Sequence, residues 1–508
     1  MNCYLGIDAG TSGIKTIIID NEGTVHGVGY CECDLITPKS GWVEQDPSKW
    51  WEACDDAVKQ VVNNSGKAKE IQGIGFSGQM QGCTPFDKDM RPVGNSLIWL
   101  DQRSVREVDE IYNLVDEQTL LKITANECLN SFLAPKVLWL RKNEPRRYEK
   151  IHKLLFAKDY LRFLMTGEIA TDVSDASTSG LMDIPQRKWS ERLFKALDIP
   201  LSFVPGNMVE SQTVTGTLRK TIAEEWGLKT GIPVVAGGGD QPTGGVGTGI
   251  VQSGIVGTAV GTSGVVFCCL DEPFFDTKKR ALYSMAHAVP NKWCFLGLVL
   301  TAGGTFKWLR DTFYSDKKAY DTYDYMTELA SQASPGSEGL TFLPYMNGEK
   351  TPVNDADARS VFFGLSHRHG QAEICRSVME GVTFALRDTI DIYREMGKEV
   401  YEVRASGGGA KSALWRQIQA DIFNANVLTM NLEEGPASGG AILAAVGAGE
   451  FSSIQEACDT LLKITEVTEP INENVKRYED YHAVYKKLYP ALKDAFSEQA
   501  QNVAIYLD

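Results

Sequence analysis

The tetrapeptide Gly-Thr-Ser-Gly occurs twice in this chain, at residues 10–13 and again at residues 261–264. Each copy lies between two apolar runs that are rich in β-branched residues, and the two copies are separated by about half of the 508 residues. An apolar run, a tight glycine turn and a second apolar run are typical of a strand–turn–strand unit. The sequence therefore predicts two similar halves, each of which begins with the same hairpin.

Short strands and longer helices alternate along the rest of the chain. Apolar runs predict strands at 71–76, 232–236 and 403–405, and apolar side chains spaced four apart predict helices over 374–390 and 414–422. This alternation favours layered α/β architecture. Because 508 residues exceed the size of one ordinary core, we expect two domains, with the boundary in the glycine-rich segment 237–254.

Composition excludes several classes of protein. The formal net charge is −15, so the chain would gain nothing from releasing counterions on DNA or RNA, and we expect no nucleic acid partner. No apolar stretch reaches the roughly 18 residues of a membrane span, so we expect no membrane partner. The N-terminus has neither the basic nor the apolar region of a secretory signal. We therefore expect a cytoplasmic protein whose 11 cysteines are reduced thiols.

The two hairpins carry groups that suit phosphate. The first holds Asp8, Thr11, Ser12 and Lys15 around its glycine turn. A glycine-rich turn lets backbone N–H groups approach phosphate oxygens, and a preceding carboxylate can hold Mg²⁺ directly or through water. The second hairpin repeats the donors, and two such loops facing one another could grip a triphosphate, as in the actin, Hsp70 and hexokinase superfamily. A plain hairpin with a helpful glycine turn is the alternative for each copy.

A carboxylate follows the second predicted strand. Residues 234–240 read VVAGGGD, so Asp240 comes directly after an apolar run and three glycines. Ligands of α/β folds bind at the C-terminal ends of strands, and transfer of a phosphoryl group to a hydroxyl needs a base beside the acceptor. Taken alone, an aspartate that caps the next helix is the more common role for such a residue.

Polar side chains and an aromatic ring gather in the segments 76–82 and 98–103. Gln79, Gln81, Trp99, Asp101 and Arg103 would suit a sugar, whose hydroxyls need hydrogen-bonding partners and whose C–H face packs on a ring. The alternatives are a core position for Trp99 and a surface ion pair between Asp101 and Arg103.

Two further glycine-rich segments lie near the C-terminus. In 406–423, three glycines precede a helix that we expect to begin near Lys411 or Ser412, an arrangement that suits the adenosine or phosphates of a nucleotide but is also common in ordinary α/β connections. In 435–450, small residues favour close packing of a helix against its neighbours.

Ordered motifs over nearly the whole chain resemble the FGGY carbohydrate kinases, and among them most of all the xylulokinase branch. They are GIDAGTSGIK at the start, GWVEQDP at 41–47, SGQM at 77–80, LIWLDQR at 97–103, APKVLWL at 134–140, AKDYLRFLMTGEIATDVSDAS at 157–177, IPVVAGGGD at 232–240, VGTSGVVF at 260–267, FLPYMNGEKTP at 342–352, FFGLSHRHG at 362–370 and SGGGAKSALWRQIQADIF at 406–423.

The resemblance implies an α/β fold of two actin-like (ribonuclease H-like) lobes with the active site in the cleft between them. Residues 1–246 would form the N-terminal lobe, which binds the sugar and carries the catalytic aspartate, and residues 247–508 the C-terminal lobe, which binds ATP. Catalysis would use Asp240 as the base and Asp8, both near Mg²⁺. The sugar would contact Met80, Gln81, Trp99, Asp240 and Gln241, and ATP would contact Thr11, Ser12, Lys15, Gly261, Thr262, Gly303, Lys307, Gly409 and Ala410.

The implied reaction is ATP-dependent phosphorylation of a small ketose, with D-xylulose to D-xylulose 5-phosphate as the first candidate. Two positions depart from the usual pattern of that branch: Gln81 replaces a histidine, and Gln241 replaces an asparagine. Glutamine can donate and accept hydrogen bonds but cannot carry the proton of a histidine. Ribulose, glycerol, gluconate and an unusual ketose therefore stay open as substrates.

Functions outside catalysis fit less well. Asp8, Asp240 and both hairpins argue against an inactive sugar sensor, and the segment after Thr465 is too short for the peptide-binding region of an Hsp70-like ATPase. The sequence leaves the oligomeric state open, with a homodimer as one candidate.

Overall fold

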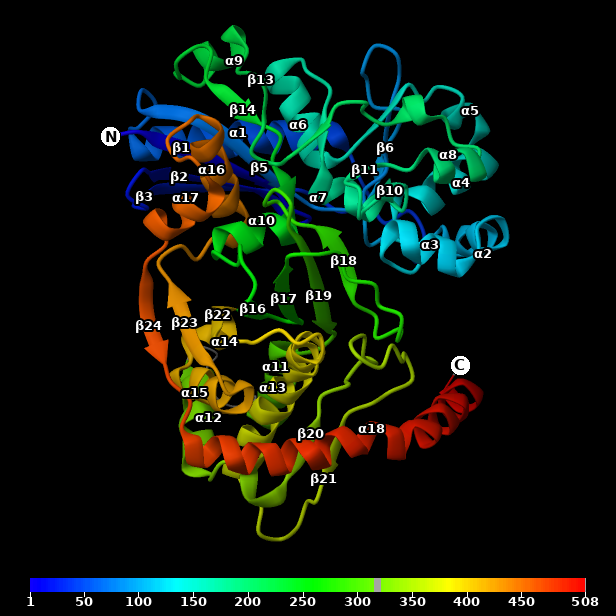
Figure 1. Cartoon of the computed structure of the whole chain (residues 1–508). Helices are drawn as coiled ribbons and strands as arrows, with labels where there is room; N and C mark the ends of the chain where they lie inside the picture. The colour runs from blue at the N-terminus through cyan, green and yellow to red at the C-terminus, as the bar shows by residue number, and fades with distance from the viewer. Residues whose placement is uncertain (315–320, 508) are drawn as a thin grey trace.

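Two large sheets dominate the computed structural model, which describes residues 1–314 and 321–507 (Figure 1). Within those residues each sheet has seven strands. The first sheet has the order β13 (Val214–Thr217), β14 (Pro233–Val235), β5 (Ile71–Gly78), β1 (Cys3–Ala9), β2 (Gly13–Asp20) and β3 (Val25–Glu32), with β15 (Gly238–Gly239) also beside β5. The second has the order β18 (Tyr283–Ala286), β19 (Trp293–Val299), β17 (Gly264–Leu270), β16 (Ile255–Val260), β22 (Glu402–Gly407), β23 (Asn426–Met430) and β24 (Ile464–Thr468).

The same topology occurs in both sheets. β1, β2 and β3 are antiparallel, and β5 lies parallel to β1 on its other side. β16, β17 and β19 are likewise antiparallel, and β22 lies parallel to β16. One Gly-Thr-Ser-Gly turn joins β1 to β2, and the other joins β16 to β17. The predicted duplication is therefore confirmed.

Long helices cover the two sheets. α1 (Pro47–Ser65) packs against β2 and β3; Asp46 caps its start, and it ends at Gly66 in the left-handed conformation. α13 (Gln371–Glu395) is buried along most of its length against β17, β19 and α15 (Ala413–Phe423). The helices expected over 374–390 and 414–422 are confirmed, as are the strands expected near 71, 232 and 403.

The helix α16 (Gly435–Gly447) packs against the first sheet although it follows β23 of the second (Figure 1). Glycines permit this contact. A Cβ atom on Gly6 of β1 would lie 2.0 Å from the backbone oxygen of Ala437, and one on Gly75 of β5 would lie 2.0 Å from that of Gly440. The expectation of close helix packing in this segment is confirmed.

The remaining elements surround the two sheets. Residues 44–225 contain β4 (Glu44–Gln45), β6 (Thr84–Phe86), β7 (Ser96–Leu97), α2 (Val105–Leu114), α3 (Glu117–Thr124), α4 (Leu133–Asn143), α5 (Pro145–Tyr148), β8 (Lys153–Leu155), α6 (Ala157–Thr166), β9 (Thr171–Asp172), α7 (Val173–Ala176), β10 (Met182–Asp183), β11 (Lys188–Trp189), α8 (Glu191–Ala196), β12 (Met208–Val209) and α9 (Lys220–Glu225). The later elements are α10 (Asp240–Gly247), α11 (Gly303–Phe313), α12 (Asp321–Gln332), β20 (Thr341–Leu343), β21 (Val361–Phe363), α14 (Gly408–Lys411), α17 (Ile454–Leu461) and α18 (Asn472–Leu507).

The helices and the cysteines bear on the expected environment of the protein. Within the described ranges, no helix combines the length and the apolarity that a membrane crossing needs. All 11 cysteines carry free thiols, and nine of them are buried.

Candidate functional site

Strand register brings the two candidate catalytic acids to one edge of the first sheet. β5 lies between β1 and β15 and is parallel to both, and its residue Ser77 is opposite Asp8 on one side and Gly238 on the other. Asp240 follows β15 directly as the first residue of α10. The N-cap position belongs to Gly239, so the alternative that Asp240 is an ordinary helix cap is wrong.

Burial makes both carboxyl groups weak acids. It raises the pKa of Asp240 to about 7; the charge of Asp8 raises it too, while hydrogen bonds from Gln241 oppose the shift. Burial also raises the pKa of Asp8 to about 6, against the opposing influence of Ser77 and Lys15. A carboxylate with a pKa near neutrality suits a general base, because a large fraction is ionised at working pH and the ionised form still binds a proton well.

The carboxylate of Asp8 fits a role beside a cation. Its Oδ1 atom is buried and has no hydrogen-bond partner. Within residues 1–314 and 321–507, no cluster of three or more His, Cys, Asp or Glu side chains is arranged to hold a metal ion. Mg²⁺ in kinases is usually bound by one or two carboxylates, with water and substrate phosphates as the other ligands. Asp8 and Asp240 could supply those carboxylates.

The first hairpin is braced by neighbouring segments. The indole Nε1 of Trp99 donates a 2.8 Å hydrogen bond to Oγ1 of Thr11, and the backbone oxygen of Ser12 accepts a 3.0 Å hydrogen bond from the amide of Cys33. Lys15 forms a 2.5 Å ion pair with Glu434, the residue before α16. The structure therefore brings Trp99 to the first hairpin, and Lys15 to a carboxylate from the second half of the chain.

Trp99 is not a core residue. Its side chain is 42% exposed, so the alternative that placed it in the core is wrong. An exposed ring that is held in place by its own N–H group can serve as a flat wall for a ligand.

Met80 and Gln81 lie on the turn that follows β5. Met80 is buried and packs so closely on Gly239 that a Cβ atom there would lie 2.6 Å from its Cε. Gln81 has a φ of 69°, in the left-handed region. Its backbone oxygen accepts a 2.9 Å hydrogen bond from Nζ of Lys136. The structure therefore places Met80 against the turn that carries Asp240.

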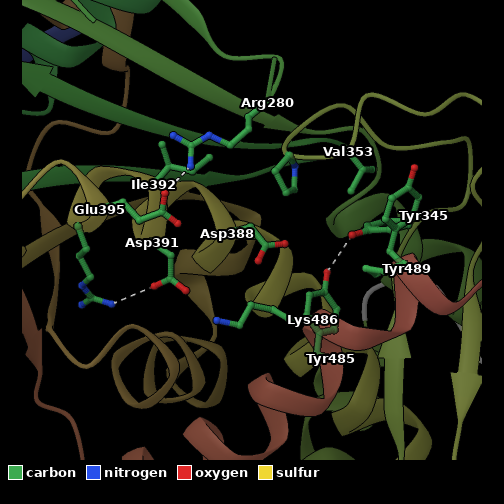
Figure 2. Close-up of a pocket in the computed structure, with 13 residues that line it drawn as sticks. Arg280, Tyr345, Val353, Asp388, Asp391, Ile392, Glu395, Tyr485, Lys486 and Tyr489 are labelled. Carbon is green, nitrogen blue, oxygen red and sulfur yellow. Dashed lines mark hydrogen bonds and ion pairs between the residues drawn. The ribbon is translucent and has the colours of Figure 1, made fainter. Parts of the chain in front are cut away.

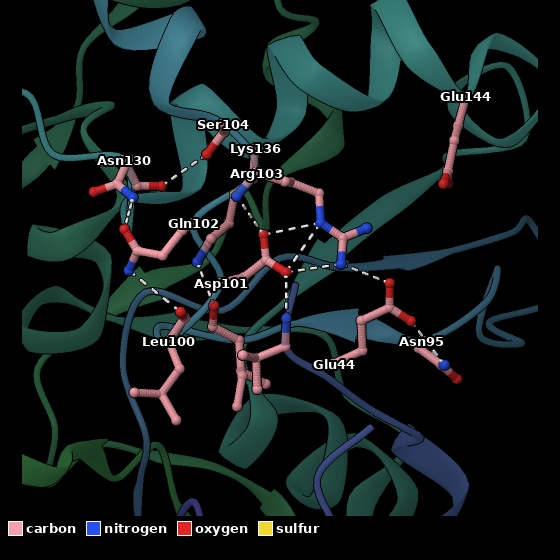
Figure 3. Close-up of polar contacts among 12 residues, drawn as sticks. Glu44, Asn95, Leu100, Asp101, Gln102, Arg103, Ser104, Asn130, Lys136 and Glu144 are labelled. Atoms are coloured by element: carbon pink, nitrogen blue, oxygen red, sulfur yellow. Dashed lines mark hydrogen bonds and ion pairs between the residues drawn. The ribbon is translucent and has the colours of Figure 1, made fainter. Parts of the chain in front are cut away.

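Asp101 and Arg103 form a buried network rather than a surface ion pair, so that alternative is wrong (Figure 3). The Arg103 guanidinium contacts Asp101 and Glu44, each at 2.7 Å, and its carbon atom lies 3.9 Å from the ring centroid of Trp42. Asp101 also accepts a 2.7 Å hydrogen bond from the amide of Val43. With its charge already paired, this network braces the loop around Trp99.

One cavity of about 640 Å³ contains none of the predicted site residues (Figure 2). It lies between α13, α18 and the loop at Val353, and Asp388 points into it among ion-paired side chains. Burial keeps the pKa of Asp388 well above its usual range, which favours the neutral acid. Nothing in this cavity resembles a phosphate-binding loop.

A second cavity of about 730 Å³ collects the predicted nucleotide residues of the second half. It is lined by Gly261 and Thr262 of the second hairpin, by Gly303 and Lys307 of α11, and by Gly409 of α14. Ala410, in the same short helix as Gly409, is buried and does not line it.

The second hairpin is hydrogen-bonded directly to α11. The amide of Gly303 donates to the backbone oxygen of Gly261 at 2.8 Å, and the amide of Gly304 donates to that of Thr262 at 3.0 Å. Lys307 forms an ion pair with Asp311 at 2.5 Å. Three glycine-bearing segments far apart in the sequence therefore meet at one cavity.

Sequence reasoning missed the aromatic wall of this cavity. Phe306 stacks on Tyr323, with ring centroids 6.0 Å apart, and packs edge-on against Trp415 at 5.6 Å. All three rings line the cavity. The aromatic residues of 306–323 and the Trp in SALWRQ were visible signals, but nothing local connects them. The helix expected near Lys411 or Ser412 begins at Ala413 with Ser412 as its N-cap, after the short helix α14.

Domain models of one protein family match both halves of the chain. The model of the N-terminal domain of the FGGY family of carbohydrate kinases matches residues 3–247, and that of the C-terminal domain matches residues 257–448. A xylulose kinase of Staphylococcus epidermidis is 35% identical over 96% of this chain and 97% of its own length.

Solved structures match this chain over nearly its whole length. A xylulose kinase from Brucella ovis has a TM-score of 0.89 at 33% identity, covering 97% of this chain and 100% of its own. A gluconate kinase from Lactobacillus acidophilus has a TM-score of 0.90 at 25% identity, covering 98% and 99%. The expected fold of two actin-like lobes is confirmed.

Proposed function

The chain belongs to the FGGY family of carbohydrate kinases, and from that premise we propose that it uses ATP to phosphorylate a small ketose, with D-xylulose as the first candidate and D-xylulose 5-phosphate as the product. The observation that carries the proposal is the pairing of Asp240, whose pKa is raised to about 7, with Asp8 at one edge of the first sheet.

Asp240 acts as the base of the proposed reaction. It accepts the proton of the sugar hydroxyl while that oxygen attacks the γ-phosphorus of ATP, and the bond from the γ-phosphorus to the bridging oxygen breaks to release ADP. In such a loose transition state, positioning of the acceptor contributes more than the strength of the base. Met80, Gln81, Trp99 and Gln241 orient the sugar beside Asp240.

A bound Mg²⁺ would neutralise charge on the phosphate oxygens. Asp8 would hold it, with Asp240 nearby, and the unpartnered oxygen of Asp8 supports this assignment. Thr11, Ser12 and Lys15 would face the phosphates from the first half. Gly261, Thr262, Gly303, Lys307, Gly409 and Ala410 would hold ATP from the second half. The cavity of about 730 Å³ with its aromatic wall supports the placement of the first five, which line it.

The names of the relatives support D-xylulose, since curated relatives at 35% identity are xylulose kinases. Two features keep a second substrate class in view: Gln81 and Gln241 depart from the xylulokinase pattern, and a gluconate kinase has the same fold. Ribulose, glycerol, gluconate and unusual ketoses are therefore the alternative acceptors.

The organisation of the molecule follows from the same proposal. We place the N-terminal lobe at residues 1–246 and the C-terminal lobe at 247–508; the family-model limits of 247 and 257 support that division. We further propose a cytoplasmic enzyme that acts on a small-molecule sugar and ATP. A homodimer is the assembly to be tested by light scattering.

The decisive test measures ADP release with a panel of ketoses, polyols and gluconate, with product position read by NMR. We expect turnover that depends on the sugar and is greatest with D-xylulose. Asp240→Asn should lower kcat by at least about a thousandfold, because general-base assistance and precise placement of the acceptor are both lost. ATP and sugar should still bind to the variant, as measured by calorimetry.

Near-wild-type turnover of Asp240→Asn would show that Asp240 is not the base. Equal rates with every acceptor, or ATP hydrolysis without sugar, would contradict the proposed substrate class.

A further inference from the structure

We propose that Ser174 is a positioning residue for the base: its hydroxyl links the Gly239 amide to a buried carboxylate, Asp172, and so holds the turn that carries Asp240. This inference rests on the proposed role of Asp240. Ser174 and Asp172 both lie in the motif at 157–177.

The relay consists of two hydrogen bonds. The amide of Gly239 donates to Oγ of Ser174 at 3.0 Å, and that hydroxyl donates to Oδ2 of Asp172 at 2.5 Å. Because the hydroxyl accepts one bond and donates the other, its orientation is fixed by both partners. Gly239 precedes Asp240 directly, so this relay sets the position of the base.

Asp172 is itself anchored by a charge with no access to solvent. Nζ of Lys158 lies 2.9 Å from Oδ1 of Asp172, 2.8 Å from Asp159 and 3.5 Å from Asp175. All four side chains are fully buried. A hydrogen bond to a buried charged acceptor is stronger than one between neutral groups, so Asp172 can hold the Ser174 hydroxyl tightly.

Packing confines the turn on several sides, and the Ser174 hydroxyl is one of them. A Cβ atom on Gly237 would lie 2.4 Å from the backbone oxygen of Phe76, and Gly237 has a φ of 73°. A Cβ atom on Gly238 would lie 2.8 Å from the Ser174 hydroxyl. Met80 packs against Gly239, the third glycine of the turn. The three glycines before Asp240 are therefore required by a turn that is clamped by its neighbours.

A base held in this way gains its effect from geometry. Loss of placement by about an ångström can lower a rate by roughly a hundredfold, even when the substrate still binds. Removing the Ser174 hydroxyl would leave the buried Gly239 amide without its acceptor, so the turn would shift or admit water. The expected result is a fall in kcat with little change in KM.

Ser211 offers a matched control. It is fully buried like Ser174, and its hydroxyl donates to the same Oδ2 atom of Asp172 at 2.8 Å. It forms no hydrogen bond with Gly239, whereas its backbone oxygen, which an alanine would keep, accepts from Gly237. Ser174→Ala and Ser211→Ala therefore remove equivalent bonds to Asp172, and only the first breaks the relay.

The experiment compares both variants with the full-length enzyme in the sugar-dependent ADP-release assay. Rates are expressed per site that binds a non-hydrolysable ATP analogue, so that a smaller folded fraction does not imitate lost catalysis. Ser174→Ala should lower kcat by about 10- to 100-fold with sugar and ATP KM within about threefold. Ser211→Ala should keep kcat within about threefold of wild type.

Hydrogen–deuterium exchange supplies a readout independent of turnover. The peptide that spans Gly239 should exchange faster in Ser174→Ala than in Ser211→Ala, because only the former frees that amide. Equal kcat losses in the two variants, no loss in Ser174→Ala, a change in KM alone, or equal exchange of the Gly239 peptide would each overturn the proposal. Failure of the proposed function would appear differently, as a wild-type enzyme without sugar-dependent turnover but with the same difference in exchange.

Discussion

At the scale of single residues, the site holds Asp240 where its ionised form is unfavourable. Asp240 is half-buried, and Asp8 adds a second negative charge beside it. The pKa of Asp240 is consequently raised from 3.8 to about 7. This arrangement costs stability when the group is ionised, as is common for residues selected for catalysis.

The effect of Asp240 on the free energy of unfolding depends on pH. Between pH 4 and 7 the folded chain holds a proton on Asp240 that the unfolded chain has released, so the contribution to the free energy of unfolding falls as pH rises through this window. Asp240→Asn should therefore raise the free energy of unfolding at pH 8, by up to about 4 kcal/mol, and by less at pH 5. Urea unfolding at both pH values measures the difference.

Asp20→Asn provides a control of opposite sign. Burial raises the pKa of Asp20, but hydrogen bonds from His26 and from the amides of Thr24 and Glu22 lower it by more, so its ionised form is favoured in the folded protein. This variant should be less stable than wild type at pH 8. Unchanged or reduced stability of Asp240→Asn at pH 8 would show that the ionised carboxylate of Asp240 does not destabilise the folded state.

At the scale of elements, one buried lysine of α4 joins the segments proposed to bind sugar. Nζ of Lys136 donates to the backbone oxygens of Gln81 at 2.9 Å, Ile98 at 2.8 Å and Ser131 at 2.6 Å. Its three N–H groups thus match three carbonyl acceptors, although burial lowers the pKa of Lys136 to about 7. The residues next to Ile98 and Gln81 are Trp99 and Met80, so α4 sets the spacing of the two loops proposed to bind sugar.

Lys136→Met should therefore loosen these loops while leaving the second half intact. Three backbone carbonyls, one buried and two partly buried, would lose their donor, which should cost about 3 kcal/mol of stability. The sugar KM should rise at least about tenfold, with the ATP KM within about twofold. Urea unfolding and steady-state kinetics measure the two effects.

Lys142→Met on the same helix is the matched control. Lys142 is partly exposed and pairs with glutamates of α2, so its loss should change stability by less than about 1 kcal/mol and leave both KM values unchanged. An equal rise of the sugar and ATP KM in Lys136→Met would contradict a local role for Lys136.

At the scale of the whole molecule, α16 joins the two halves through backbone contact. It packs between the first sheet and α10, the helix that begins with Asp240 (Figure 1). A Cβ atom on Gly439 would lie 1.9 Å from the backbone oxygen of Thr243 in α10. Because the obstacle is backbone, it cannot be relieved by a change of rotamer.

Gly439→Ala should therefore push α16 away from α10. We expect a loss of about 2 to 3 kcal/mol in the free energy of unfolding and a lower kcat, since α10 begins with the proposed base. Urea unfolding and the ADP-release assay test both effects. In Gly435→Ala, on the same helix, the added Cβ atom meets nothing within 4 Å, so stability should stay within about 0.5 kcal/mol. Similar losses in the two variants would contradict the close contact.

The sequence pattern predicted local secondary structure well, but it predicted poorly which residues lie together in space. The hairpins, α13 and α15 were predicted because strand and helix periodicity is a property of adjacent residues. Trp99 in the core and Asp101 with Arg103 on the surface were wrong alternatives. The position of Trp99 depends on a hydrogen bond to Thr11, and the burial of Asp101 and Arg103 depends on Glu44 and Trp42, all of which lie far away along the chain.

By itself, the sequence determined the duplicated hairpins, the α/β class and the chemical types present, because each is encoded in short runs of residues. Only the tertiary structure decided which groups act together. It brought Asp8 beside the turn of Asp240, placed Ser174 and Lys158 behind that turn, and lined the cavity at the second hairpin with Phe306, Tyr323 and Trp415. The physical reason is that burial and charge pairing depend on long-range contacts, which no local pattern contains.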